Sequence, residues 1–268
     1  MFSARLSLLA LVGTAILAAA PASASQSWPA IRDQLYAGKT LHDGSLIIKL
    51  DAPDRPEDQM NVPIGVEATL KDGRTIKTVT VLVDENPTPV AAKFNFTQAR
   101  THVGLAAKFR FDKVTGVRAI VETSDGELYM AERHVRFTGG TSACSAPPNG
   151  SPEEIAANMG NMQLSPVGPR AMASNAAQRV KLSVSHPNHT GMVLDQITLY
   201  YIPLNLMERV SVKQSGKTVV EFEGSMSFSQ DPTVEFDFLT DGAEELEVTA
   251  SDTAGGAWTH ALPLGPSS

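Results

Sequence analysis

Apolar and polar residues alternate along two long stretches of the chain, and a period of two is typical of strands that bury one face. Turn-forming pairs separate the segments of the first stretch: Asp72-Gly73, Asn86-Pro87 and Asp125-Gly126. Its segments, between about residues 45 and 139, are SLIIKL, VPIGVEATL, TIKTVTVLV, AAKFNF, VGLAAKFRF, VRAIVET and ELYMAERHVRF. Short strands at this spacing predict a β-sandwich.

The second stretch, from about residue 179 to 264, repeats the pattern. Its segments are VKLSVSHP, ITLYYIP, MERVSVKQ, KTVVEFEG, TVEFDFLT, LEVTASD and WTHALPL, with turns at Ser215-Gly216, Asp241-Gly242 and Gly255-Gly256. Each stretch has about the size of an immunoglobulin-type sandwich, roughly 100 residues. The predicted fold class is therefore all-β, with two immunoglobulin-like β-sandwiches joined by a linker that carries a short helix.

Two segments have helical character instead. In WPAIRDQLYAG, residues 28–38, apolar side chains recur at helical spacing, which predicts a short packing helix. Ser151-Pro152-Glu153-Glu154 has the form of a capping box with proline in the first turn, so a second helix is predicted from there to about Gln163.

The N-terminus has the pattern of a secretory signal peptide. Arg5 precedes the apolar run LSLLALVGTAILAAA, and PASA then offers a cleavage site after Ala24. The run is shorter than the roughly 20 residues of a membrane span, and no later segment qualifies. We expect a periplasmic protein with a signal peptide at 1–24, sandwiches at 25–139 and 179–268, and a linker at 140–178.

Composition excludes several function classes. The chain carries 22 basic and 29 acidic side chains, for a net charge of −7, and only 6% of its residues are aromatic. An acidic chain without a basic stripe is unsuited to nucleic acid. The nucleophile elbow, the Walker loop, the dinucleotide fingerprint and the zinc-protease motif are all missing. We therefore expect no enzyme activity and no cofactor.

The only cysteine, Cys144, lies in GGTSACSAPPNGSP, residues 139–152. Small and turn-forming residues surround it, which predicts an exposed thiol on a mobile connector between two rigid bodies. A thiolate is a nucleophile, and a free cysteine titrates near pH 8.5. An unpaired cysteine in an exported protein points to a reactive group or a partner thiol.

Other interpretations of these residues stay open. Cys144 is either without a role, or joined to Cys144 of a second copy in a covalent dimer, or a Cu(I) ligand together with Met159, Met162 and Met172. The methionines fit an apolar helix face better than a ligand set. His186 and His189 form only a loose ligand pair, and zinc needs further ligands. We expect no metal site.

Several motifs resemble the SoxY and SoxZ families, the two halves of a periplasmic sulfur carrier. The segment VRAIVETSDGELYMAERHVRFTGGTSACSAPP is similar to the end of SoxY, and VTVLVDENPTPVAAKFNF to its core. VSHPNHTG, residues 184–191, and the segment from IPLNLMERV to VEFDF are similar to SoxZ. The similarity runs from about residue 40 to 264, in the order SoxY then SoxZ.

The resemblance implies a carrier. Cys144 would hold a covalent sulfur intermediate of thiosulfate oxidation, Gly139 and Gly140 would be the hinge of its arm, and partner enzymes would load and hydrolyse the cargo. This chain departs from the family, whose arm is a free Gly-Gly-Cys-Gly-Gly tail: here Thr141-Ser142-Ala143 intervenes and the chain continues. In that respect it resembles fused SoxYZ-like carriers associated with quinoprotein (PQQ-type alcohol) dehydrogenases.

Three hypotheses follow. In the first, the protein is a periplasmic carrier that holds a sulfur species on Cys144 for Sox-type redox enzymes. In the second, it is a non-catalytic accessory module of a quinoprotein dehydrogenase and Cys144 has no role. In the third, it handles copper through Cys144 and the linker methionines.

Overall fold

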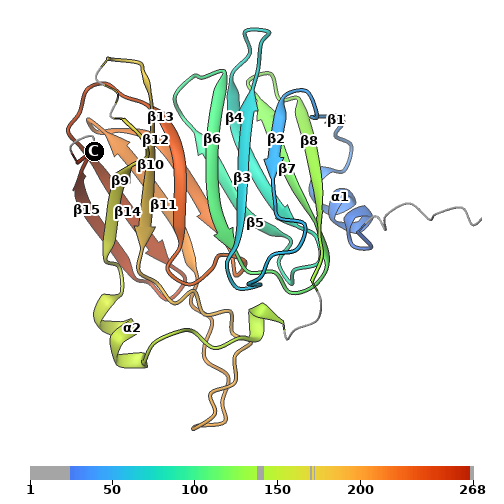
Figure 1. Cartoon of the computed structure of the whole chain (residues 1–268), viewed down its shortest axis with the longest axis vertical. Coiled ribbons are helices and arrows are strands. Elements are labelled where there is room, and N and C mark those ends of the chain that lie inside the picture. Colours follow the sequence, from blue (N-terminus) through green and yellow to red (C-terminus); the bar gives the residue numbers. More distant parts are fainter. Residues whose placement is uncertain (1–24, 138–141, 170, 172, 266–268) are drawn as a thin grey trace, which may run out of the picture.

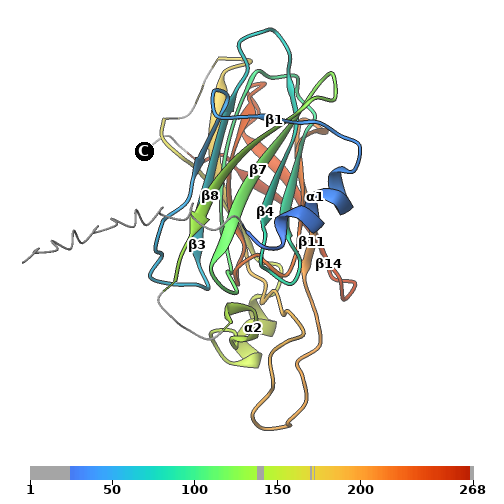
Figure 2. The same cartoon turned by 90° about the vertical axis from the view of Figure 1, so that its right-hand side faces the viewer.

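The structure is a computed structural model that describes residues 25–137, 142–169, 171 and 173–265. The predicted signal peptide at 1–24 lies outside the described residues, as do the predicted hinge residues Gly139 and Gly140. All fifteen described strands belong to two facing sheets, so the all-β fold class is confirmed (Figures 1 and 2).

Eight strands come from the first half of the chain: β1 (Leu41–Asp43), β2 (Ile48–Asp51), β3 (Val62–Thr69), β4 (Ile76–Val83), β5 (Val90–Phe96), β6 (His102–Phe109), β7 (Thr115–Thr123) and β8 (Leu128–Val135). Alternation explains them: in β3, Val62, Ile64 and Val66 are buried while the residues between them are less so. The sequence pattern predicted every one of these strands except the three-residue β1.

Seven strands come from the second half: β9 (Met162–Pro166), β10 (Ala177–Val184), β11 (Met207–Gln214), β12 (Lys217–Gly224), β13 (Thr233–Leu239), β14 (Glu245–Asp252) and β15 (Ala257–Pro263). Of these, β11 and β12 have the predicted bounds. The hairpin between them turns at Ser215 and Gly216, which both have positive φ, as a tight two-residue turn requires.

The two halves share both sheets. The nine-stranded sheet has the order β1-β8-β7-β4-β5-β12-β11-β14-β15, and the six-stranded sheet has the order β2-β3-β6-β13-β10-β9. The halves meet where β5 pairs with β12 and β6 pairs with β13, both antiparallel. One cluster of buried apolar side chains runs through both halves. The expectation of two separate rigid bodies is therefore wrong: edge strands of one half are paired by the other.

Two short helices lie outside this sandwich. Helix α1 (Trp28–Tyr36) confirms the first helix prediction and packs Ile31 against Leu82, Ile120 and Leu128 on the outer side of the nine-stranded sheet (Figure 2). Helix α2 (Pro152–Asn158) begins with the predicted capping box between Ser151 and Glu154. None of the helices in the described part of the chain is long and apolar enough to cross a membrane.

Two parts of the predicted linker and second sandwich differ from expectation. Helix α2 ends at Asn158 and not near Gln163, because Gly160 has a positive φ of 78° and β9 then joins the six-stranded sheet beside β10. The predicted strand ITLYYIP is not a strand. It forms the tip of a loop, residues 194–204, that projects from the end of the sandwich below α2 (Figure 1). We call it the apolar loop.

Candidate functional site

Cys144 lies in a short 3-10 helix, Ala143–Ser145, and its side chain is fully buried. The prediction of an exposed thiol on a mobile connector is therefore wrong for this structure. Residues 142–150, which we call the strap, lie across the end of the sandwich and are bonded to both halves. Ala143 and Cys144 are both small and both buried, and Cys144 lies against Asp112, Arg110 and Thr190.

A few hydrogen bonds hold the strap in place. The hydroxyl of Ser142 donates to the carboxylate of Asp112, which follows β6 in the first half. The hydroxyl of Thr190, from the second half, donates to the carbonyl oxygen of Cys144 at 2.6 Å. At the far end of the strap, the backbone of Asn149 exchanges two hydrogen bonds with the side chain of Gln230.

The surface under the strap is built by the motif HPNHTG, residues 186–191. Asn188 is fully buried at φ 48°, a conformation that asparagine tolerates better than most residues. Its amide donates to the carbonyls of Ser225 and Phe228, and its side-chain oxygen accepts from the backbone of Met207. The motif is thus a rigid platform for the strap. This structural role gives a reason for the similarity of the motif to SoxZ.

Among the residues that the structure describes, the two histidines of this motif belong to no group of three or more potential metal ligands. His186 is buried with its Nε2 3.3 Å from Asp252, its Nδ1 accepts from the backbone N–H of Asn188, and its own backbone N–H donates to the carboxylate of Asp231. Burial lowers the pKa of His186, against an opposing effect from Asp252. Burial lowers the pKa of His189 too, helped by the nearby His186 and Arg110. Both rings are therefore neutral at pH 7.

Arg110 joins the platform to the first half. This buried side chain follows β6 and donates to the carbonyls of Asn188, at 2.7 Å, and Pro187, at 3.2 Å. Its Nε has no hydrogen-bond partner in the described part of the chain. Burial lowers the pKa of Arg110, while an anionic Cys144 would raise it. Sequence reasoning did not single out Arg110, Asp112 or Thr190, because only the fold brings them to the cysteine.

The electrostatics of the site keep the thiol protonated. Burial raises the pKa of Cys144 to about 12, and the carboxylate of Asp112 acts in the same direction by its charge and by a hydrogen bond to the thiol. Arg110 opposes both effects without overcoming them. Because the thiolate is the nucleophile, a thiol held in this buried, raised-pKa setting is a poor nucleophile at neutral pH.

The copper interpretation rests on Cys144 and three methionines, two of which the structure describes. Met159 follows α2 and Met162 belongs to β9, while Met172 lies outside the described residues. Among the described residues, the one group of three or more histidine, cysteine and acidic side chains close enough to hold a metal ion does not include Cys144.

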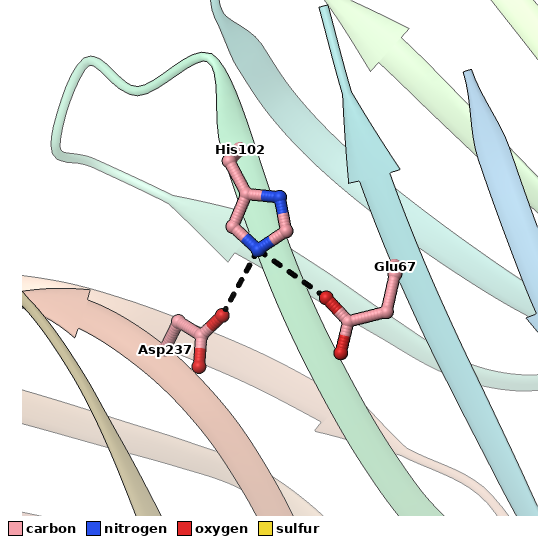
Figure 3. Close-up of side chains that lie close together, drawn as sticks. All are labelled: Glu67, His102 and Asp237. Carbon is pink, nitrogen blue, oxygen red and sulfur yellow. Dashed lines mark ion pairs between the residues drawn. The ribbon is translucent and has the colours of Figure 1, made fainter.

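That group is Glu67, His102 and Asp237, whose ligand atoms lie within 4.8 Å of one another. Figure 3 shows the ring of His102 on β6 directed between the carboxylates of Glu67 on β3 and Asp237 on β13. Its Nε2 is 3.3 Å from Glu67 and 3.5 Å from Asp237. No sequence motif signals this cluster, since its members are far apart along the chain.

Arg179 already binds both carboxylates of this cluster. Its guanidinium donates to Glu67 at 2.6 Å and to Asp237 at 2.6 and 3.0 Å. The cluster lies over Gly104, where an added Cβ would come within 1.6 Å of the guanidinium. Glu67 and Asp237 come from different halves, so we interpret the cluster as an ion-pair network across the junction.

Comparisons with known proteins agree with the sequence motifs. Residues 32–143 match the family model of SoxY, sulfur oxidation protein SoxY, and residues 167–263 match that of SoxZ, sulphur oxidation protein SoxZ. No curated protein matches the sequence.

Solved structures give weaker likenesses. The sulfur carrier protein SoxY from Chlorobium limicola f thiosulfatophilum is 22% identical, with 42% of this chain and 97% of that chain covered and a TM-score of 0.36. A superoxide reductase (neelaredoxin) from Ignicoccus hospitalis is 14% identical, with 41% and 86% covered and a TM-score of 0.28. At these TM-scores we draw no conclusion from either.

The two family matches define the class of this protein: a sulfur-oxidation carrier built from SoxY and SoxZ domains in tandem. The chain belongs to the fused SoxYZ-like proteins, and its only cysteine directly follows the end of the SoxY match.

Proposed function

We propose that the protein is a periplasmic carrier that holds a covalent sulfur intermediate on Cys144 and passes it between Sox-type enzymes. The observation that carries this proposal is the position of the cysteine. It directly follows the SoxY match, and the motif similar to SoxZ supplies the platform beneath it. The chain itself catalyses nothing in this proposal, and the partner enzymes perform the redox and hydrolytic steps.

The loading reaction shows that a partner enzyme must accept two electrons. With thiosulfate as the substrate, the reaction is R–SH + S₂O₃²⁻ → R–S–S–SO₃⁻ + H⁺ + 2e⁻. A sulfur–sulfur bond forms, the thiol proton goes to solvent, and the electrons go to a partner redox enzyme. Thiosulfate and the thiol are oxidised together, and the enzyme is reduced.

A sulfur adduct on Cys144 does not fit in the structure in which the strap covers the thiol. The thiol of Cys144 has no exposed surface, and the carboxylate of Asp112 is beside it. The thiosulfate-derived adduct –S–SO₃⁻ would add five heavy atoms and a negative charge to a packed site, which is unfavourable in both respects. We therefore propose two states: an unloaded, strapped form with an inert thiol, and a loaded form with the strap released. The hydrogen bonds that hold the strap are few enough for local opening.

The test is the mass of the protein isolated from its own periplasm. We expect part of it to carry on Cys144 the mass of thiosulfuric acid less two hydrogen atoms, or of further sulfur atoms, and to lose it in reductant. The Cys144→Ser variant should carry nothing. Unmodified wild-type protein from cells oxidising thiosulfate would contradict the proposal. The same preparation reports on location, since periplasmic protein should begin at Ser25.

A second candidate function is favoured by the complete burial of Cys144 and its raised pKa. In that case the protein is an accessory module of a quinoprotein dehydrogenase, and the cysteine only fills space under the strap. A deletion strain complemented with the Cys144→Ser variant separates the candidates. The carrier function requires loss of thiosulfate oxidation with the fold intact, whereas the accessory function requires full complementation.

A further inference from the structure

The apolar loop projects from the end of the sandwich where helix α2 lies (Figure 1). It exposes several large apolar side chains to solvent. The exposed fractions are 92% for Ile197, 69% for Leu199, 77% for Tyr200 and 66% for Tyr201. Leu194, Leu204 and Met192 extend the exposed surface. Scattered apolar residues are normal on a surface, but a contiguous group of this size is typical of an interaction site.

The loop is held in shape by its own hydrogen bonds. The carboxylate of Asp195 accepts from the backbone of Ile197 and Thr198, at 2.8 and 2.9 Å. The backbones of Asp195 and Tyr200 pair at 2.9 Å, which closes the tip. The apolar side chains are therefore presented in a fixed arrangement, and a partner would lose little conformational entropy in ordering them.

A groove of about 530 Å³ separates the loop from α2. Tyr200, Tyr201 and Pro203 line its loop side, and Ile155 and Met159 line its α2 side. Aromatic, proline and aliphatic surfaces of this kind suit an apolar segment of a partner protein.

The charge around the groove has one sign. Asp195 lies in the groove, and Glu154 and Asp231 line a hollow that shares Gly150 and Ile155 with it. Among the residues lining these two hollows there is no lysine or arginine. The complementary surface is a basic one, which attracts its partner over distance as well as in contact.

The groove also touches the strap over Cys144. Pro148 and His189 line both the groove and the small cavity beside Arg110 and Thr190. Thr190 in turn holds the carbonyl of Cys144. A segment that enters the groove therefore contacts Pro148 of the strap and His189 of the platform, which lie beside the residues that hold Cys144.

We propose that the apolar loop and this groove form the docking surface for the Sox-type enzyme that loads Cys144, and that the enzyme inserts an apolar segment bordered by lysine or arginine. The inference rests on the carrier function proposed above. A second copy of this chain fits poorly, because its own groove is acidic and would repel. An anionic membrane surface is repelled for the same reason.

Binding measurements with defined proteins test the proposal. The probe is the purified thiosulfate-loading Sox enzyme of the same organism, titrated with this protein as Cys144→Ser so that no covalent capture contributes. We expect the Ile197→Ser/Tyr200→Ser variant to weaken binding at least tenfold, as for central aromatic anchors. Glu154→Lys should weaken it severalfold, and so should a rise in NaCl from about 20 to 300 mM.

Leu46→Ser is the matched control. Leu46 is 94% exposed, and it precedes β2 at the opposite end of the sandwich, so its substitution should change Kd less than twofold. Equal binding of the wild type and the loop variant would overturn the proposal. So would no binding at all, or sedimentation showing a dimer that the loop variant abolishes. A native adduct on Cys144 with no effect of the loop leaves the carrier function standing and removes only the docking surface.

Discussion

The strap and the apolar loop lie at the same end of the molecule, but they differ in the solvent exposure of their side chains. The strap is made of small and turn-forming residues, yet it buries Cys144 completely. The apolar loop is rich in isoleucine, leucine and tyrosine, yet it exposes them. The thiol of Cys144 is thus buried, while an apolar interaction surface is exposed near it. This arrangement suits a protein whose thiol should react only after a partner protein has bound.

The reactivity of Cys144 is the sharpest test of this contrast. At pH 8, native protein should react with a thiol reagent on the order of a thousandfold more slowly than unfolded protein, because burial leaves so little thiolate. The measurement is the labelling rate with and without denaturant. A native rate within tenfold of the unfolded rate would mean that the strap does not protect the thiol.

The same pKa has a consequence for stability. Because the folded pKa, about 12, lies above the unfolded one, the unfolded chain loses its thiol proton first as pH rises. The free energy of unfolding should therefore be unaffected by this group below about pH 8.5 and should fall between there and pH 12. Comparison of wild type with Cys144→Ser isolates this part of the decline, which the variant should lack.

Loss of the platform should have the next largest effect. Asn188→Ala removes three hydrogen bonds in a fully buried site and places alanine at positive φ, so we expect a loss of about 2–3 kcal/mol in the free energy of unfolding. Urea titration measures it. Asn158→Ala, which removes exposed hydrogen bonds at the end of α2, is the control and should cost less than about 0.5 kcal/mol.

A milder change should loosen the strap. Thr190→Val keeps the shape of the side chain and removes its hydrogen bond to Cys144, worth about 1 kcal/mol, together with the longer one that it accepts from the backbone of Met192. Loss of the bond to Cys144 should speed up thiol labelling about fivefold. Thr249→Val, which removes a hydrogen bond to Thr259 between β14 and β15, should leave labelling unchanged. If both variants accelerate labelling equally, global unfolding and not release of the strap exposes the thiol.

The smallest effect is expected in the apolar loop. Ile197→Ser should change the free energy of unfolding by less than about 0.5 kcal/mol, since the side chain is already in water. Val193→Ala, at the buried base of the same loop, should cost about 2 kcal/mol. A large loss for Ile197→Ser would show that the loop packs onto the protein in solution, and the contrast with the strap would disappear.

The sequence predicted the strands well where one face of each is buried. Alternation alone placed β3, β11 and β12, since each strand has a core side and a solvent side. It failed for ITLYYIP, whose composition favours a strand but which makes only an isolated bridge, between Leu194 and Tyr201, outside both sheets. It also missed β9, which is short and stabilised mainly by pairing with β10.

The site was harder to predict, because burial depends on what lies opposite in space. The residues around Cys144 gave no sign that Thr190, Asp112 and Arg110 would enclose it. The resemblance to SoxZ pointed to the HPNHTG motif without saying that it would support the cysteine. Local composition described the strap correctly as irregular, but an irregular segment made of small residues can still pack tightly.

The pairing of β5 with β12 and of β6 with β13 joins the two halves of one chain, so the association of the halves does not depend on protein concentration. The enclosure of Cys144 needs parts of both halves, and as two separate chains these would dissociate as their concentration falls. A single chain holds them at a fixed one-to-one ratio and a constant effective concentration. The protected thiol therefore persists however scarce the protein becomes.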